Sequence, residues 1–285
     1  MSEGIQTAVS KPSSKVQTII AAGGLLAGGI AIFVFGNPYY RVFPTNRNQT
    51  YAVGLTVFSL VLALVFRRIP SLARYGTAVY ALFVAAAVTV SLQTGMIRLH
   101  HSAMLPMQNL AMDKLSQFLM IVPILMSLIC LGGGDAGSIF IKLGDWKRGL
   151  RFGLLWFVLF GAAGLAIQWG AMDLEALVTA VPYLLLFVFA NATMEELWFR
   201  GIFLRSFEAL IGRWGAVVVT AVLFGASHIN ATYDFPGGSI IFGVVVFILG
   251  AVGAHAMLKD DSVIGPILFH AGYDLMIIVP VINSL

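Results

Sequence analysis

The sequence predicts an all-α, polytopic membrane protein with about eight to nine transmembrane helices and a polar cavity inside the membrane. Hydrophobic residues make up 59% of the 285 residues and charged residues only 11%, whereas soluble domains carry about 25% charged residues. Several apolar runs approach or exceed the roughly 20 residues that cross a bilayer as a helix. The runs are continuous rather than alternating, which argues against an outer-membrane barrel.

The apolar runs define nine candidate helices, of which the second and fourth are short. They fall at about 16–36, 51–66, 76–97, 115–131, 149–169, 176–199, 214–229, 239–257 and 262–283. The mixed segment 100–116 is expected to be interfacial or re-entrant. The loop 132–148 separates N-terminal helices (1–145, with a polar tail over 1–15) from a C-terminal helical core (146–285), which holds the chemically interesting residues.

Lysine and arginine residues in short loops predict the orientation of the chain, because such residues gather in cytoplasmic loops. With nine spans, one side carries Lys11, Lys15, Arg67, Arg68, Arg74, Lys142, Lys147, Arg148, Arg151, Arg200, Arg205, Arg213 and Lys259. The other side carries only Arg41, Arg47, Arg98 and Lys114. We therefore expect a cytoplasmic N-terminus. The compactness of the chain and the style of its motifs favour the plasma membrane of a prokaryote. The net charge of +4 sets topology and does not indicate nucleic-acid binding. The single cysteine, Cys130, excludes an internal disulfide and a cysteine-cluster metal site.

Ionisable residues lie inside apolar surroundings over residues 174–230, which form a predicted helical hairpin. Charges in such surroundings are costly and indicate a functional site. Glu195 lies 17 residues before a predicted turn at Gly212, and His228 lies 16 residues after it. At a rise of about 1.5 Å per residue, both are roughly 25 Å from the turn. Two antiparallel helices would therefore bring Glu195 and His228 to the same depth.

The two adjacent glutamates are expected to have different roles. Glu196 and Arg200 are spaced i, i+4 with the acid first, which favours a helical ion pair. Glu195 points about 100° away around the helix, so it is the freer carboxylate and the candidate base. The alternative is a buried cluster in which both glutamates share Arg200. On the second helix, His228 shares a face with Phe224.

The last apolar run adds His270 and Asp274, which are also spaced i, i+4 and point the same way. Asp274 could orient His270, or the two could form a self-contained structural hydrogen bond. Glu195, His228 and His270 have the composition of a catalytic zinc site. The same residues suit metal-free activation of water, with Glu195 as general base and a histidine stabilising an oxyanion. Both alternatives stay open at this point.

Three motifs resemble the signature motifs of the CAAX-protease and bacteriocin-processing (CPBP/Abi) family of intramembrane endopeptidases. They are Glu195-Glu196-x-x-x-Arg200, Phe224-x-x-x-His228 and His270-x-x-x-Asp274, and the resemblance covers about residues 175–280. It implies a water-accessible cavity between membrane helices and a peptide or protein substrate, lipidated or not, met among membrane lipids. It also implies that Glu195 activates water and that Glu196, His228, His270 and Asp274 complete the site. The oligomeric state is not predicted.

Other functions fit the sequence less well. The chain has no His-Glu-x-x-His, so a site-2 type zinc protease is disfavoured. Tyr273-Asp274 and the Gly132–Asp135 segment occur in the reverse of the order found in aspartyl intramembrane proteases. A proton-coupled transporter and a non-catalytic membrane scaffold or immunity protein are the remaining alternatives. Flux in proteoliposomes would reveal a transporter, and a phenotype that survives Glu195→Ala would reveal a scaffold.

Overall fold

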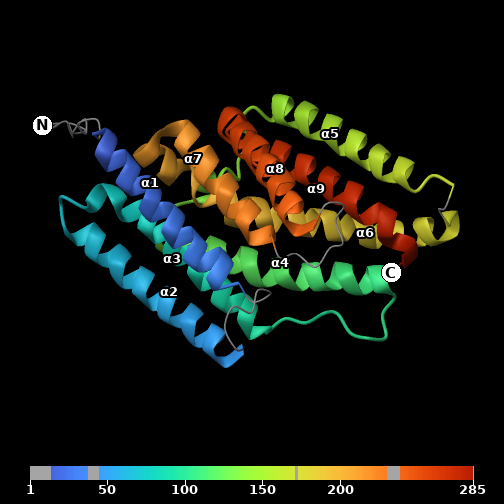
Figure 1. The fold of residues 1–285 in the computed structure, drawn as a ribbon, viewed down its shortest axis with the longest axis horizontal. Coiled ribbons are helices and arrows are strands. Elements are labelled where there is room, and N and C mark those ends of the chain that lie inside the picture. Colours follow the sequence, from blue (N-terminus) through green and yellow to red (C-terminus); the bar gives the residue numbers. More distant parts are fainter. Residues whose placement is uncertain (1–13, 38–44, 171–172, 230–237, 285) are drawn as a thin grey trace, which may run out of the picture.

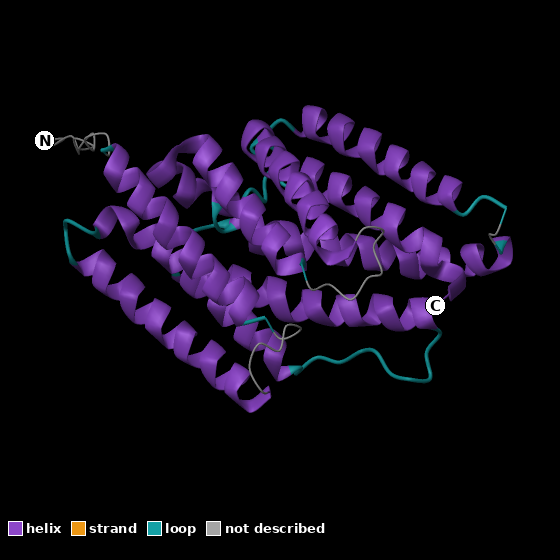
Figure 2. Cartoon of the chain, viewed as in Figure 1, coloured by secondary structure: helices purple, strands orange, loops and turns teal. Residues whose placement is uncertain are grey.

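A computed structural model describes residues 14–37, 45–170, 173–229 and 238–284. Over these residues every regular element is a helix and no strand occurs (Figure 2). Eight of the described helices are long and apolar enough to cross a membrane, and a ninth apolar helix, Ile264–Ile278, is shorter. These findings confirm the predicted all-α, polytopic membrane fold.

The described helices are drawn in Figure 1 in the order of the chain. They are α1 (Lys15–Ile30), α2 (Thr45–Arg68), α3 (Gly76–Thr94), α4 (Pro106–Leu131), α5 (Trp146–Ile167), α6 (Leu174–Glu195), α7 (Leu204–His228), α8 (Gly238–Asp260) and α9 (Ile264–Ile278). Two π-helical turns continue α1 and α6, over Ala31–Phe35 and Glu196–Gly201. Three 3₁₀ turns are formed by Ala73–Tyr75, Ala136–Ile139 and Val279–Ser284.

Helices α2 and α4 are longer than their apolar runs, which corrects the prediction that these two spans are short. Proline at the first position of a helix is favourable, and α4 begins at Pro106. The segment 100–116 is therefore not re-entrant, because its second half forms the first turns of α4. Gln117 Nε2 donates to Asp113 Oδ2 at 2.8 Å on this polar stretch. Polar residues at the start of a spanning helix hide its boundary from a search for apolar runs.

One hydrophobic core joins the N-terminal helices to the C-terminal ones. It contains buried residues of α1, α3, α4, α7, α8 and α9. The π turn after α1 meets the π turn after α6, because the Phe33 ring lies 5.3 Å from Trp198 and 4.4 Å from Phe199. Helix α5 lies on the outside of α9 (Figure 1), where it covers the last site-bearing helix.

The connections near one end of the bundle are held together by polar contacts, and we call this the basic end. Arg67 Nη2 donates to the Gly132 carbonyl at 3.3 Å, which joins the ends of α2 and α4. Arg148 Nε donates to Asp260 Oδ1 at 2.5 Å, which joins the start of α5 to the end of α8. Asp261 forms ion pairs with Lys142 and Arg205. Loops far apart in sequence therefore lie side by side here.

Candidate active site

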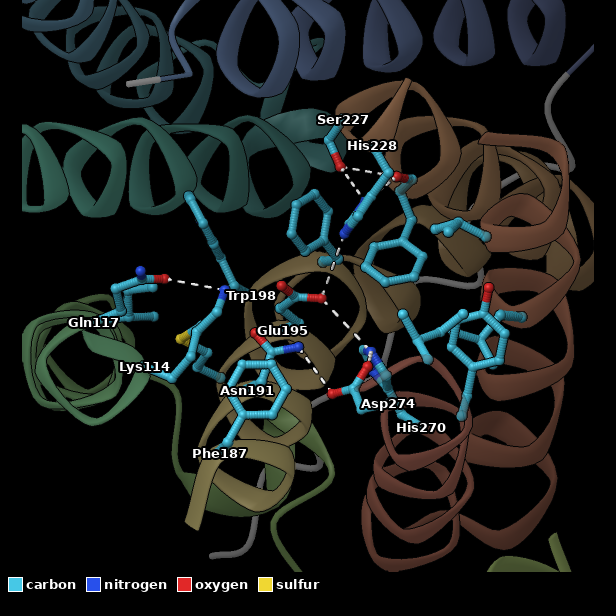
Figure 3. A pocket seen from close by; sticks show the side chains of 18 of the residues that line it. Lys114, Gln117, Phe187, Asn191, Glu195, Trp198, Ser227, His228, His270 and Asp274 are labelled. Carbon is cyan, nitrogen blue, oxygen red and sulfur yellow. Dashed lines mark hydrogen bonds and ion pairs between the residues drawn. The ribbon is translucent and has the colours of Figure 1, made fainter. Parts of the chain in front are cut away.

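A cavity of about 310 Å³ lies among α3, α4, α6, α7, α8 and α9. Its lining is largely apolar and aromatic, with polar groups on four of these helices (Figure 3). The polar lining residues on α4, α6, α7 and α9 are Asp113, Lys114, Gln117, Asn191, Glu195, Ser227, His228, His270, Tyr273 and Asp274. A cavity with a few convergent polar groups in an apolar wall is the usual form of a small binding or catalytic site.

Glu195 is the point on which the polar groups converge. Its side chain reaches into the cavity from α6, and its Oε2 lies 3.7 Å from His228 Nε2 and 3.6 Å from His270 Nε2. This oxygen is buried and has no hydrogen-bond partner among the described residues. Figure 3 shows the carboxylate between the two imidazoles. The structure thus brings together three residues that stand on three separate helices.

The connection between α6 and α7 differs from the single turn predicted at Gly212. Helix α6 passes into the π turn at Glu196, and α7 starts at Leu204. Gly212 forms a second break inside α7, with φ 75° and ψ 167°, a conformation that glycine adopts without strain. Glu195 and His228 still meet at one depth. Single π turns often occur at functional sites, and this one carries Glu196 and Arg200.

Glu196 joins Arg200 to His270 in the interior. Its side chain and that of Arg200 are 1% and 0% exposed, and Arg200 Nη1 pairs with Glu196 Oε1. The same carboxylate oxygen lies 2.9 Å from His270 Nδ1. Arg200 Nε donates to the Gly250 carbonyl at 3.2 Å, and the guanidinium lies 4.3 Å from the centre of the Phe224 ring. Each charge of this buried group is therefore compensated by a partner, as burial requires.

Asp274 does not orient His270 through a hydrogen bond, which corrects one of the two predicted arrangements. Asp274 Oδ1 lies 3.6 Å from His270 Nε2, which is too long for a hydrogen bond. Asp274 Oδ2 instead accepts a hydrogen bond from Asn191 Nδ2 at 3.0 Å. The His270 ring is oriented by Glu196, which lies opposite Nδ1. The predicted self-contained His270–Asp274 hydrogen bond is absent for the same reason.

Both histidines present Nε2 to the cavity because Nδ1 is engaged elsewhere. His228 Nδ1 lies 2.8 Å from the Phe224 carbonyl, and a carbonyl oxygen can only accept, so we assign the proton to Nδ1. The ion-paired Glu196 carboxylate fixes His270 Nδ1 as a donor in the same way. The Phe224 ring packs edgewise against both imidazoles, with centroids 4.6 Å from His228 and 5.6 Å from His270.

The donor types at the centre of the cavity fit zinc, which Glu195, His228 and His270 would hold. Glutamate and two histidines are common ligands of catalytic zinc, and an Nδ1 hydrogen bond is typical of ligating histidines. However, the described residues contain no group of three or more histidine, cysteine or carboxylate side chains placed to hold a metal ion.

Sequence reasoning missed six polar residues of the cavity, which are Asp113, Lys114, Gln117, Asn191, Ser227 and Tyr273. Asn191 precedes Glu195 by one helical turn, so its place on the same face of α6 was open to prediction from spacing. Lys114 falls in the segment 100–116, which the sequence predicts to be interfacial or re-entrant because the first turns of α4 are polar. No spacing in the sequence places Lys114 opposite residues of α6 or α9.

A segment within the C-terminal half of the chain matches the model of a known family. Residues 177–276 match the family model described as type II CAAX prenyl endopeptidase Rce1-like. The matched segment runs from α6 to α9 and contains Glu195, His228, His270 and Asp274. No curated protein and no solved structure matches the chain.

Proposed function

We propose that this integral membrane protein hydrolyses a peptide bond of CAAX-type or related substrates through water activated by Glu195. The proposal is supported by the match of residues 177–276 to the Rce1-like family model. The observation that carries the mechanism is the position of the Glu195 carboxylate between two imidazole Nε2 atoms. The site lies in an apolar bundle, where such polar groups are retained for function. The family match favours this function over transport and over a scaffold role.

A water molecule held at Glu195 Oε2 is the nucleophile. Glu195 accepts one proton from the water as the water oxygen bonds to the carbonyl carbon of the substrate. The same proton then passes to the amide nitrogen of the leaving peptide as the C–N bond breaks. Glu195 thereby returns to its carboxylate form, and the products are a carboxylic acid and an amine.

The two histidines divide the remaining work. The Nδ1–H of His228 donates a hydrogen bond to the Phe224 carbonyl. Its Nε2 is therefore an acceptor, and it accepts a hydrogen bond from the water. His270 stands 2.9 Å from Glu196 and 3.6 Å from Glu195 and Asp274. Three carboxylates around one imidazole allow it to carry a second proton, on Nε2, and this N–H donates a hydrogen bond to the developing oxyanion without leaving the ring. Glu196 with Arg200 fixes the ring, and Asp274 with Asn191 closes the wall beside it.

The test is cleavage of a panel of CAAX-type peptides, prenylated and unprenylated, by the purified protein. We expect Glu195→Gln to lower kcat by about 10²- to 10⁴-fold, the range for loss of a general base. Glu208→Gln is the matched control, because Glu208 lies on α7 outside the cavity lining. Full activity of the Glu195→Gln protein would refute the mechanism.

Chelation tests the metal-free form of the proposal. We expect activity to survive prolonged treatment with a strong zinc chelator. If the chelator abolishes activity and added zinc restores it, the metal-free mechanism is wrong. Glu195, His228 and His270 would then be expected to bind zinc.

A further inference from the structure

The cavity is lined by more acidic than basic side chains, and one cation faces several carboxylates. Glu195, Asp274 and Asp113 supply acidic groups to the lining. Among the described lining residues, Lys114 is the single lysine or arginine. It stands on α4, across the cavity from Glu195 on α6 and Asp274 on α9 (Figure 3).

Lys114 is held in the cavity by a chain of polar contacts that starts in the loop before α4. His100 Nδ1 lies 3.4 Å from Asp113 Oδ1, and Asp113 Oδ2 accepts from Gln117 Nε2 at 2.8 Å. Lys114 Nζ donates to Gln117 Oε1 at 3.4 Å. The ammonium thus contacts an amide oxygen, at the long limit of a hydrogen bond. A carboxylate in its place would make a shorter, charge-assisted contact.

The ammonium is near enough to the reaction centre to matter there. Lys114, His228 and Asp274 line the same cavity. Lys114 is also half-buried in a helix that is otherwise apolar enough to cross the membrane. Lysines at such positions commonly mark a substrate path.

A CAAX-type substrate brings a negative charge to this cavity, because its cleavable segment ends in a free carboxylate. That carboxylate would be repelled by Glu195 and Asp274 unless a cation lay on its path. We propose that Lys114 binds the C-terminal carboxylate of the substrate and so positions the scissile bond at Glu195. This inference rests on the proposed endopeptidase function and adds the group that restricts cleavage to the ends of chains.

The proposal predicts a preference that a purely structural lysine would not create. A lysine ammonium is a point charge on a flexible stem. It can therefore bind the terminal carboxylate of peptides that differ in their last side chain. A peptide whose terminus is a carboxamide keeps the same side chains and loses the charge. Lys114 would therefore distinguish the acid from the amide, mainly through KM.

The experiment uses two fluorogenic peptides of one sequence, one with a free carboxylate and one with a carboxamide. We expect the wild-type protein to cleave the acid with a kcat/KM at least about tenfold above that for the amide. Lys114→Met should remove this preference by raising KM for the acid alone, and Lys114→Arg should keep most of it. Lys259→Met, an exposed lysine at the far end of α8, is the matched control and should behave as wild type.

Each outcome decides the proposal. Equal cleavage of acid and amide by the wild-type protein would overturn it, and this arm needs no variant to fold. A preference that persists in Lys114→Met, or in Lys114→Gln as a second variant, would also overturn it. Cleavage of neither peptide by the wild type would refute the proposed function itself, which is a different result from cleavage without preference.

Discussion

At the scale of single residues, Glu195 and Glu196 are neighbours in sequence and opposites in environment. Glu196 contacts Arg200 and His270 through one oxygen. Glu195 Oε2 is buried without a hydrogen bond from the described residues. A carboxylate that compensates a buried guanidinium holds the structure together, whereas one that faces a cavity is available for chemistry.

Replacement of each glutamate by glutamine should separate these two roles. We expect Glu196→Gln to lower the free energy of unfolding by about 3–5 kcal/mol, because it leaves Arg200 buried without its counter-charge. Glu195→Gln should change stability little while it abolishes activity. Thermal unfolding in detergent, beside peptide cleavage, measures both effects. Equal destabilisation by the two substitutions would contradict the assignment.

Part of the site was predictable from the sequence because helical spacing determines it. The pair of Glu196 and Arg200 follows from the i, i+4 rule. The meeting of Glu195 with His228 was predicted by counting residues from Gly212, and it holds although the connecting path contains a π turn and a second break. The partner of His270 was not predictable in this way. Glu196 stands 74 positions away in sequence, and only the packing of α6 against α9 decides whether Glu196 or Asp274 faces Nδ1.

At the scale of helices, glycines allow α5 to approach α9 closely behind the site. A Cβ atom at Gly272 would lie 2.5 Å from the Phe157 Cα, and one at Gly265 would lie 2.9 Å from the Gly149 carbonyl oxygen. Small residues at helix contacts are a common means of packing in membranes. Gly272 lies between His270 and Asp274, so the helix contact and the site share one segment.

Substitution of Gly272 should therefore disturb catalysis from outside the cavity. We expect Gly272→Ala to push α9 away from α5, with a loss of about 1–3 kcal/mol in stability and a clear loss of activity. Gly161→Ala is the matched control, because a Cβ there would meet Leu275 Cδ1 at an ordinary 3.5 Å. An active, stable Gly272→Ala protein would show that the α5 contact does not position His270.

The ion pairs at the basic end should make stability depend on pH. Partial burial raises the pKa of Asp261, but Lys142 and Arg205 outweigh this, so its pKa is lowered below the ordinary 3.8. A lowered folded-state pKa contributes stability above the unfolded value and loses it as the pH falls through the folded value. We expect Asp261→Asn to lower the melting temperature modestly at pH 7, because the pairs are partly exposed. This difference should shrink below about pH 4, and a constant difference down to pH 3 would contradict the ion-pair explanation.

The helices themselves were predictable to different degrees. Apolar runs located all nine, because the length of a spanning helix is set by the bilayer. The path between α6 and α7 was not predictable. Gly212 does break the helix, but the chain already leaves the α-helical path at Glu196. No residue type in Glu196–Gly201 predicts a π turn. The starts of α2 and α4 were missed because their first turns are polar.

At the scale of the whole molecule, the cavity and the positive charges lie toward opposite ends. On the side of the π turn, the cavity is lined by the buried rings of Trp198 and Phe199. In the other direction its lining reaches Leu92, Leu110 and Ile278, near the end of α3, the start of α4 and the end of α9. Substrates should therefore enter from the end that is poor in lysine and arginine.

The positive-inside rule predicts which end of the protein faces the cytoplasm. If the basic end faces the cytoplasm, the cavity opens on the opposite side of the membrane, and so does the loop before α4. In a Cys130→Ala background, we expect His101→Cys to react with a membrane-impermeant maleimide in intact cells. Lys147→Cys, at the start of α5 on the basic end, should react only after the membrane is permeabilised. Both side chains are exposed in the structure, so accessibility across the membrane decides the result. The reverse labelling pattern would place the basic end outside and would mean that substrates reach Glu195 from the cytoplasm.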